Sequence, residues 1–155
     1  MKSADFNNCE GLGAFDELVL KEGMQSVNFE GCTGLTGAVD KIVLPVGMQE
    51  VDFSYCPGLT GAVDTFVLPV GMQSVKFVKC TGLTGAVDTF IGAMPSYTYE
   101  DRVAGVLDTT GMKIVDFSLC SGLTGDLTQM QIPGSLIFLS LAGCEGLTGK
   151  YRRKE

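Results

Sequence analysis

Apolar residues recur along the chain in a fixed order that predicts one short strand followed by a turn. The clearest copy has apolar residues at Met72, Val75, Phe77 and Leu83, with a cysteine at Cys80. Around Val75 and Phe77 apolar and polar positions alternate, which is the pattern of a half-buried β-strand. The cysteine comes three residues after the last apolar residue of this strand. We therefore expect the chain to turn away from the sheet at the cysteine.

The same pattern returns at each of the six cysteines, which are Cys9, Cys32, Cys56, Cys80, Cys120 and Cys144. Four of the five gaps between them are 23 or 24 residues, and a fixed period of this size indicates stacked repeats. The remaining gap is 40 residues, because about sixteen additional residues, 91–106, follow the fourth copy. We expect one domain of about six repeats over residues 1–149, with an insertion at 91–106 and a basic tail at 150–155.

Stacked repeats predict one parallel sheet, because equivalent strands then lie side by side. Neighbouring strands would be about 4.8 Å apart, and each repeat would cover the apolar face of the next. The return segment 40–44 is followed at once by Pro45, so we expect turns or 3₁₀ helix there, with little α-helix. The expected strand cores are Ala4–Phe6, Val27–Phe29, Val51–Phe53, Val75–Phe77, Val115–Phe117 and Leu139–Leu141.

The order of apolar residues around the cysteine resembles the leucine-rich-repeat family, in the variant that carries Cys in place of Asn. Leu83-Thr84-Gly85 and its copies resemble the second half of plant-type repeats, although Ala-Val-Asp follows here where plant repeats have Ile-Pro. The resemblance covers nearly the whole chain. It implies a β-rich leucine-rich-repeat solenoid of the α/β type, with a parallel sheet on the concave face and short turns or 3₁₀ segments on the convex face. It also implies a non-enzymatic role in binding a protein partner of unknown identity.

Charge and composition argue against several other classes of protein. The 155 residues carry a net charge of −7, which speaks against nucleic acid or an anionic membrane as the partner. The uncharged run 127–144 contains Pro133 and fits the repeat, so we interpret it as part of a soluble domain. No apolar signal segment follows Met1, and we expect an intracellular, cytoplasmic protein with reduced cysteines.

The cysteines have one structural interpretation and several chemical ones. In the leucine-rich-repeat family the equivalent Asn or Cys points inward and bonds backbone groups, which implies a buried ladder of free thiols here. Metal sites need C-x-x-C pairs or Cys with His, and the chain has neither pattern and no His. Disulfides between neighbouring repeats fit the distance but not the S–S dihedral angle, since equivalent side chains point the same way. We expect no metal, no cofactor and no Cys-His or Ser-His catalytic pair.

Two further ladders of polar residues have two interpretations each. An aspartate or threonine in each return segment would either cap the turn that follows it or, as a row of carboxylates, bind calcium. We favour capping, because the copy that contains Cys120 has a threonine there, which is a poor calcium ligand. A second row, of threonines, would either form hydrogen bonds along the ladder or bind ice. The expected caps are Asp16, Asp40, Asp64, Asp88 and Thr128, and the threonine row is Thr36, Thr60, Thr84, Thr124 and Thr148.

The outward positions of the strands differ from repeat to repeat, which is typical of a binding face on a repeat scaffold. Drift of solvent-facing residues would give the same pattern. The insertion holds Tyr97, Tyr99 and Arg102, residue types that often anchor interfaces. It would either border the partner site or cover neighbouring repeats. The candidate partner-binding residues on the sheet are Asn28, Glu30, Asp52, Tyr55, Lys76, Lys79, Asp116 and Phe138.

Two other roles stay open at this point. The chain could be a structural segment of a longer repeat array, or a solenoid that binds ice or carbohydrate through a flat, repetitive face. The first and last repeats lack a neighbour on one side, which leaves Ala4 and Phe6 at one end and Leu139 and Leu141 at the other. We expect self-association through these ends.

Overall fold

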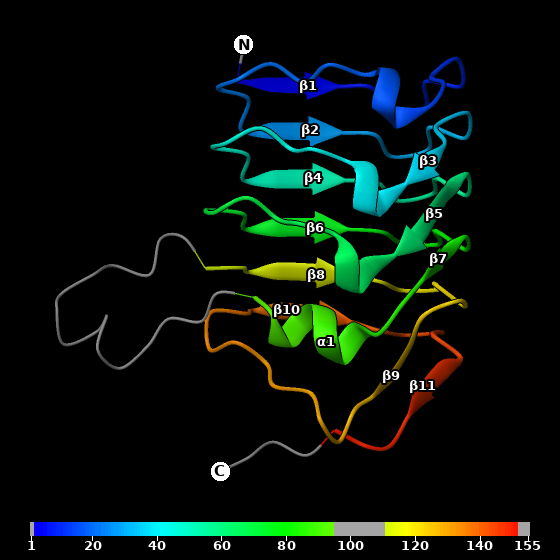
Figure 1. Ribbon diagram of the computed structural model, residues 1–155, viewed down its shortest axis with the longest axis vertical. Helices are drawn as coiled ribbons and strands as arrows, with labels where there is room; N and C mark the ends of the chain where they lie inside the picture. Colours follow the sequence, from blue (N-terminus) through cyan, green and yellow to red (C-terminus); the bar gives the residue numbers. More distant parts are fainter. Residues whose placement is uncertain (1, 95–110, 152–155) are drawn as a thin grey trace, which may run out of the picture.

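Six short parallel strands form the main sheet, and they lie in the order in which they occur along the chain (Figure 1). The computed structural model describes residues 2–94 and 111–151. Equivalent residues of successive repeats lie opposite one another, so Val51 pairs with Val75 and Val75 with Val115. The strands are β1 (Ser3–Asp5), β2 (Ser26–Asn28), β4 (Glu50–Asp52), β6 (Ser74–Lys76), β8 (Ile114–Asp116) and β10 (Phe138–Ser140).

Each strand begins and ends one residue earlier than the sequence pattern predicted. The inward residue at the end of each predicted core already belongs to the turn, because the chain leaves the sheet there. Its N–H still bonds the neighbouring repeat: Phe29 N donates to Asp52 O at 2.7 Å. Val51 at the centre of β4 and Phe53 just after it are both turned inward and are at most 1% exposed. The apolar positions therefore point as predicted, although the strand bounds differ.

A second row of strands follows the turn, where the Leu-Thr-Gly segments lie (Figure 1). The pairing register of these strands differs from that of the main sheet. Ala38 lies opposite Thr60 and not opposite its equivalent in the next repeat, Ala62. One three-stranded parallel sheet and one parallel pair form in this way. The sheet consists of β3 (Gly37–Ala38), β5 (Leu59–Ala62) and β7 (Leu83–Thr84), and the pair of β9 (Thr124–Asp126) and β11 (Gly146–Thr148).

Threonine hydroxyls join neighbouring repeats along this second row. Thr60 Oγ1 donates to Gly37 O at 3.4 Å, and Thr124 Oγ1 donates to Gly85 O at 3.3 Å. Thr148 makes the equivalent bond to the repeat before it. These three hydroxyls are engaged with the backbone of the preceding repeat, which is the ladder interpretation of the threonine row.

Short helices complete the first four repeats on the return side. The first three are 3₁₀ helices, as predicted for the short return segments, and the fourth is a six-residue α-helix. Within the described ranges, no helix is long and apolar enough to cross a membrane. The helices are η1 (Phe15–Glu17), η2 (Val39–Lys41), η3 (Val63–Thr65) and α1 (Val87–Gly92).

Helix α1 extends into the segment that the sequence analysis assigned to the insertion. Ile91 is fully buried and Met94 is 6% exposed, whereas Val67, the equivalent of Ile91 in the previous repeat, is 76% exposed. The helical turn rotates Ile91 toward the core, so residues 91–94 pack with the repeat. The remaining residues of the expected insertion, 95–106, lie outside the described part of the chain.

A column of phenylalanines runs through the core, with one ring from each of the first five repeats. The rings of Phe29, Phe53 and Phe77 are fully buried, and their centroids are 5.4 and 5.2 Å apart with nearly parallel planes. Phe6 and Phe117 continue the column at its two ends. Phenylalanines of the return side contact it edge-on, and these are Phe15, Phe66 and Phe90. Such aromatic pairs add about 0.5–1.5 kcal/mol to the free energy of burial.

We predict that Phe53→Ala lowers the free energy of unfolding by about 3–5 kcal/mol, because it opens a cavity in the middle of this column. Chemical denaturation followed by circular dichroism measures the effect. Phe138→Ala is the matched control, since Phe138 is 48% exposed on the outward face. It should cost clearly less than Phe53→Ala. Equal losses for the two variants would contradict the assignment of Phe53 to the core.

Candidate binding face

The outward side chains of the last residue in each of the six strands form a row that mostly serves the fold. We call it the strand-end row, and it consists of Asp5, Asn28, Asp52, Lys76, Asp116 and Ser140. In four of the six repeats the Asp or Asn side chain accepts a hydrogen bond from the backbone N–H two residues further on, at 2.9–3.0 Å. This arrangement is an Asx turn, which holds the chain as it leaves the strand. Asn28, Asp52 and Asp116, expected as partner-binding residues, therefore also have a structural role.

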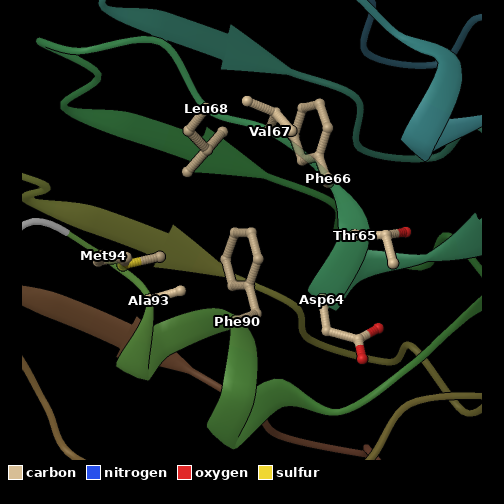
Figure 2. A pocket seen from close by; sticks show the side chains of 8 residues that line it. All are labelled: Asp64, Thr65, Phe66, Val67, Leu68, Phe90, Ala93 and Met94. Atoms are coloured by element: carbon tan, nitrogen blue, oxygen red, sulfur yellow. The ribbon is translucent and has the colours of Figure 1, made fainter.

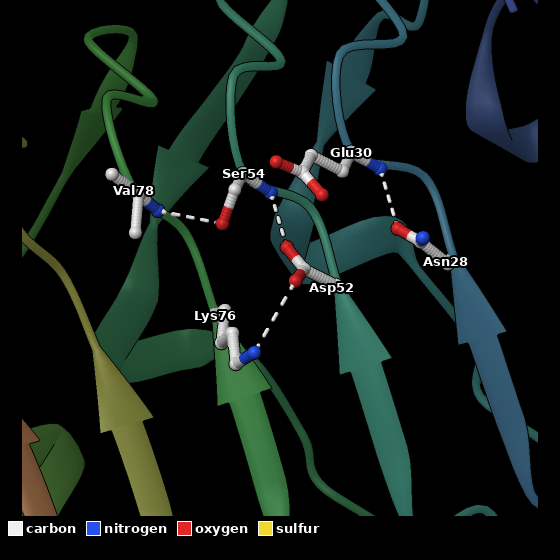
Figure 3. Close-up of polar contacts among 6 residues, drawn as sticks. All are labelled: Asn28, Glu30, Asp52, Ser54, Lys76 and Val78. Carbon is white, nitrogen blue, oxygen red and sulfur yellow. Dashed lines mark hydrogen bonds and ion pairs between the residues drawn. The ribbon is translucent and has the colours of Figure 1, made fainter. Parts of the chain in front are cut away.

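Lys76 interrupts the Asx turns because its side chain has no acceptor, and the repeat before it compensates (Figure 3). The backbone N–H of Val78, which an Asx side chain would otherwise bind, donates instead to Ser54 Oγ at 3.2 Å. The ammonium group of Lys76 lies 3.7 Å from Asp52 Oδ2. The lysine is 42% exposed, so this ion pair contributes only about 0–1 kcal/mol. The pair links the basic side chain at the end of β6 to the acidic one at the end of β4.

A second row lies just past the strand ends, where the backbone adopts the left-handed conformation in every repeat. Each N–H of this row but the last donates to a carbonyl of the next repeat, as Tyr55 N does to Val78 O at 2.7 Å. Gly31 and Gly143 adopt this conformation without steric cost, and asparagine tolerates it. We call this the left-handed row, and it consists of Asn8, Gly31, Tyr55, Lys79, Leu119 and Gly143, with φ between 58° and 75°.

Three successive members of the left-handed row are bulky side chains in a backbone conformation that disfavours them. Tyr55, Lys79 and Leu119 have φ of 60°, 58° and 62°. All three are exposed, with 45% of Tyr55 and 49% of Leu119 accessible to solvent. Residues held in this region cost on the order of 1–3 kcal/mol each and persist where the surrounding structure enforces them. Because they come from consecutive repeats, the three side chains lie in one line beside the sheet.

The candidate binding face is therefore narrower than the sequence suggested. We define it as Tyr55, Lys79, Leu119 and Phe138, the last of which is exposed at the start of β10. Leu119 was not expected there, although its alignment with glycine and asparagine in other repeats was a signal for the left-handed conformation. The remaining candidates are Glu30, which is half-buried and donates its N–H to Asn28, and Tyr97, Tyr99 and Arg102, which lie outside the described residues.

The cysteines form a ladder of thiols that donate to the preceding repeat. Cys56 Sγ donates to Phe29 O at 3.1 Å, and Cys80 Sγ donates to Phe53 O at 2.9 Å. Cys32, Cys120 and Cys144 make the same contact at 2.8–3.0 Å. All six thiols are free, and five of them are buried, while Cys9 in the first repeat is exposed. In each case the acceptor is the carbonyl of the phenylalanine that directly follows the strand of the preceding repeat.

Burial raises the pKa of these thiols, and it does so more strongly than their hydrogen bonds with the neighbouring repeats lower it. The pKa of Cys56 is raised from 9.0 to about 12, and that of Cys120 to about 12 as well. The pKa of Cys80 is raised further in the same direction. The thiolate is the reactive form of cysteine. At neutral pH these side chains are therefore hydrogen-bond donors and poor nucleophiles.

The expectation that aspartates cap the return helices was wrong in position. The N-cap residue of each of the four helices is an alanine without a side-chain hydrogen bond, and the aspartate lies two residues further on, in the first turn. In the fifth repeat the acceptor is Asp126, because Thr128 donates to Asp126 Oδ1 through both its N–H and its hydroxyl, at 2.9 and 2.7 Å. Both hydrogen bonds lower the pKa of Asp126, and the bond from the Thr128 hydroxyl has the larger effect. The aspartates in the first turns of the four return helices are Asp16, Asp40, Asp64 and Asp88.

Three of these aspartates, Asp40, Asp64 and Asp88, instead lie against a glycine of the next repeat. A Cβ on Gly85, whose φ is +99°, would lie 2.3 Å from Asp64 Oδ1, and one on Gly125 would lie 2.6 Å from Asp88 Oδ1. The glycine of the Leu-Thr-Gly segment is thus required both by backbone conformation and by space. Among the described residues, no group of three or more acidic, Cys or His side chains gathers in a way that could hold a metal ion.

The return side carries a depression of about 320 Å³ between η3 and α1 (Figure 2). The rings of Phe66 and Phe90 line it, and Asp64 is the one acidic side chain in its lining. A single carboxylate without a second titratable group does not provide the acid and base pair of a general acid–base mechanism. The depression lies on the return side and not on the candidate binding face. The other lining residues are Thr65, Val67, Leu68, Ala93 and Met94.

No model of a known protein family matches the chain, and a search of curated proteins finds no match either.

We predict that the buried thiols make the protein sensitive to alkaline pH. A folded-state pKa above the unfolded value means that the native state holds the proton more tightly, so this contribution is intact below pH 9 and falls as the pH rises toward 12. Each such thiol should lower the free energy of unfolding by on the order of 1 kcal/mol per pH unit between pH 10 and 11.

Cys56→Ala isolates this effect, because all other titrating groups are shared with the wild-type protein. The variant should be less stable at pH 7, since it loses a hydrogen bond and some packing. Its stability should then fall less steeply than that of the wild type between pH 9 and 11. Parallel pH profiles from urea titrations would show that Cys56 is not protected from ionisation by the fold.

We predict that Lys79→Gly stabilises the protein by about 0.5–1 kcal/mol, because glycine removes the steric cost of the left-handed backbone but adds freedom to the unfolded chain. Lys76→Gly is the matched control, since this lysine lies three residues earlier within β6. There glycine should destabilise, because it weakens a strand and removes the pair with Asp52. A loss of stability for both variants, measured by thermal unfolding, would show that Lys79 is not strained.

Proposed function

We propose that this chain is a leucine-rich-repeat solenoid that binds a protein partner through the outward face of its main sheet, without catalysis. Support for the class comes from the sequence motif together with parallel strands stacked in register, short return helices and a ladder of cysteines that donate to backbone carbonyls. Support for binding comes from the candidate binding face. Its position on a rigid sheet matches the way repeat scaffolds present an extended surface.

The observation that carries the proposal is the run of three bulky residues in the left-handed row. Gly31 and Gly143 hold the same position elsewhere at no steric cost, so the fold itself does not require Tyr55, Lys79 or Leu119. Strain of this kind concentrates at ligand-binding sites, where the side chain is useful in spite of its conformational cost. Tyrosine is also among the residue types that most often dominate binding energy at protein interfaces.

The chemistry of the described residues supports binding over catalysis. The buried cysteines are hydrogen-bond donors with raised pKa values, and the depression on the return side has one carboxylate. The chain contains no His to act as a base near pH 7. A net charge of −7 favours a protein partner over nucleic acid. Ice binding through the threonine row has less support, because Thr60, Thr124 and Thr148 donate their hydroxyls to backbone carbonyls.

A variant in which Tyr55, Lys79 and Leu119 are all replaced by glycine tests the proposal. The partner is first captured from the native source by a photo-crosslinking residue at position 79 and identified by mass spectrometry, then produced in pure form. We predict that the triple variant stays folded, because glycine suits the left-handed backbone, and that its affinity for the partner falls at least tenfold. Calorimetry measures the affinity and circular dichroism the fold.

The matched control changes three exposed apolar residues of the return side, Val43, Val46 and Val67, to serine. These side chains are 76–82% exposed, so the control also stays folded, and it should bind the partner with unchanged affinity. Full affinity of the triple glycine variant, or crosslinking that is equally efficient from position 43, would contradict binding through the sheet face.

A further inference from the structure

The two ends of the main sheet carry matching halves of one hydrogen-bond pattern. Inside the sheet, two N–H groups of each repeat donate to carbonyls of the next repeat. One belongs to the inward residue directly after the strand, and the other belongs to the left-handed row. Phe117 N donates to Ser140 O at 2.9 Å and Leu119 N to Ala142 O at 2.7 Å. In the last repeat the equivalent donors are Leu141 N and Gly143 N, and among the described residues no further strand lies beyond them.

The first repeat carries the acceptors that these donors lack. Asn28 O accepts from Phe6 N and Glu30 O accepts from Asn8 N, both at 2.8 Å. Their equivalents one repeat earlier are Asp5 O and Asn7 O, at the outer edge of β1. By the same pattern Lys2 N and Ser3 N would donate to Ile137 O, as Gln49 N and Glu50 N donate to Gln25 O.

The cysteine ladder is interrupted at the same two ends. Cys144 Sγ donates to Phe117 O at 3.0 Å, and each buried cysteine before it has such an acceptor in the preceding repeat. Cys9 has no preceding repeat within this chain, and its thiol is exposed. Leu141 O is the carbonyl that a seventh cysteine would use. One thiol without its acceptor and one carbonyl without its donor thus stand at opposite ends of the molecule.

The side chains at the two ends also match. Phe6 stacks on Phe29, and Leu141 occupies the next position after Phe117 in the column, where it is half-buried.

We propose that the protein assembles head to tail, with β1 of one copy pairing in parallel and in register with β10 of the next copy. Ser3 then lies opposite Phe138, Ala4 opposite Leu139 and Asp5 opposite Ser140. Cys9 Sγ donates to Leu141 O of the neighbouring copy, and Phe6 continues the apolar column on Leu141. Because the interface joins two different surfaces, it leaves a free end after each addition and forms open chains. The candidate binding face stays exposed along such a chain, so the assembly is independent of the proposed partner.

Two variants with one blocked end each provide the test. Phe6→Lys places a charge on the first end, and Leu141→Lys places one on the last. Sedimentation velocity over a concentration series should show oligomers growing for the wild type and monomers for each variant alone. An equimolar mixture of the two variants should form a dimer and grow no further. The intact last end of Phe6→Lys pairs with the intact first end of Leu141→Lys, and the two ends that remain are both blocked. Val43→Lys, at an exposed position on the return side of the second repeat, is the control and should assemble like the wild type.

Other outcomes overturn the proposal. A wild-type protein that stays monomeric over the whole series would do so, and so would a single variant that dimerises alone, since this requires contact between like ends. A second measurement does not depend on the folding of any variant. Alkylation of the exposed Cys9 thiol in the wild type should become several-fold slower as the concentration rises, because assembly covers it. A rate that does not change with concentration would contradict the assembly.

Discussion

Pairing of each strand with the equivalent strand of the next repeat, residue opposite equivalent residue, is the constraint on which the rest of the structure depends. A shift of one residue would turn every inward side chain outward, because neighbouring residues of a strand face opposite sides. With this register kept, Phe53 meets Phe29 and Phe77, and Cys56 reaches the carbonyl of Phe29. The stacked rings, the thiol ladder and the threonine ladder are three consequences of the same repeat translation.

The register also explains why hydrogen bonds within and between repeats constrain the polar residues of the outward face. The repeats share the same local hydrogen bonds. When the side chain of one repeat lacks an acceptor, a neighbouring repeat has to supply it. Lys76 breaks the row of Asx turns; Ser54 of the previous repeat supplies the missing acceptor, and Asp52 forms an ion pair with the lysine. Tyr55 and Leu119 have no compensation of this kind, since both keep a strained backbone and an exposed side chain. That difference separates residues that serve the fold from those we assign to binding.

Periodicity in the sequence predicted the parallel sheet and the buried position of Phe53, because burial of one apolar face per repeat is a local requirement. It did not predict the role of Asp52, which looked like a variable surface residue. An Asp or Asn at the last residue of a strand, which can accept from the N–H two residues further on, is a recognisable Asx signal. The bond between Ser54 and the repeat of Lys76 could not be predicted, since it joins residues far apart in sequence. The strain at Tyr55 was readable only from glycine at the same position in other repeats.

The most direct test of the register lies where the sequence departs most from its period, between the fourth and fifth repeats. The structure places Val75 of β6 directly opposite Val115 of β8, although 40 residues separate them. Nuclear Overhauser contacts between backbone protons across these two strands report the pairing without any mutation. We expect cross-strand contacts that pair Val75 with Val115 and Lys76 with Asp116. Contacts shifted by one residue, or no contact between these strands, would contradict this pairing.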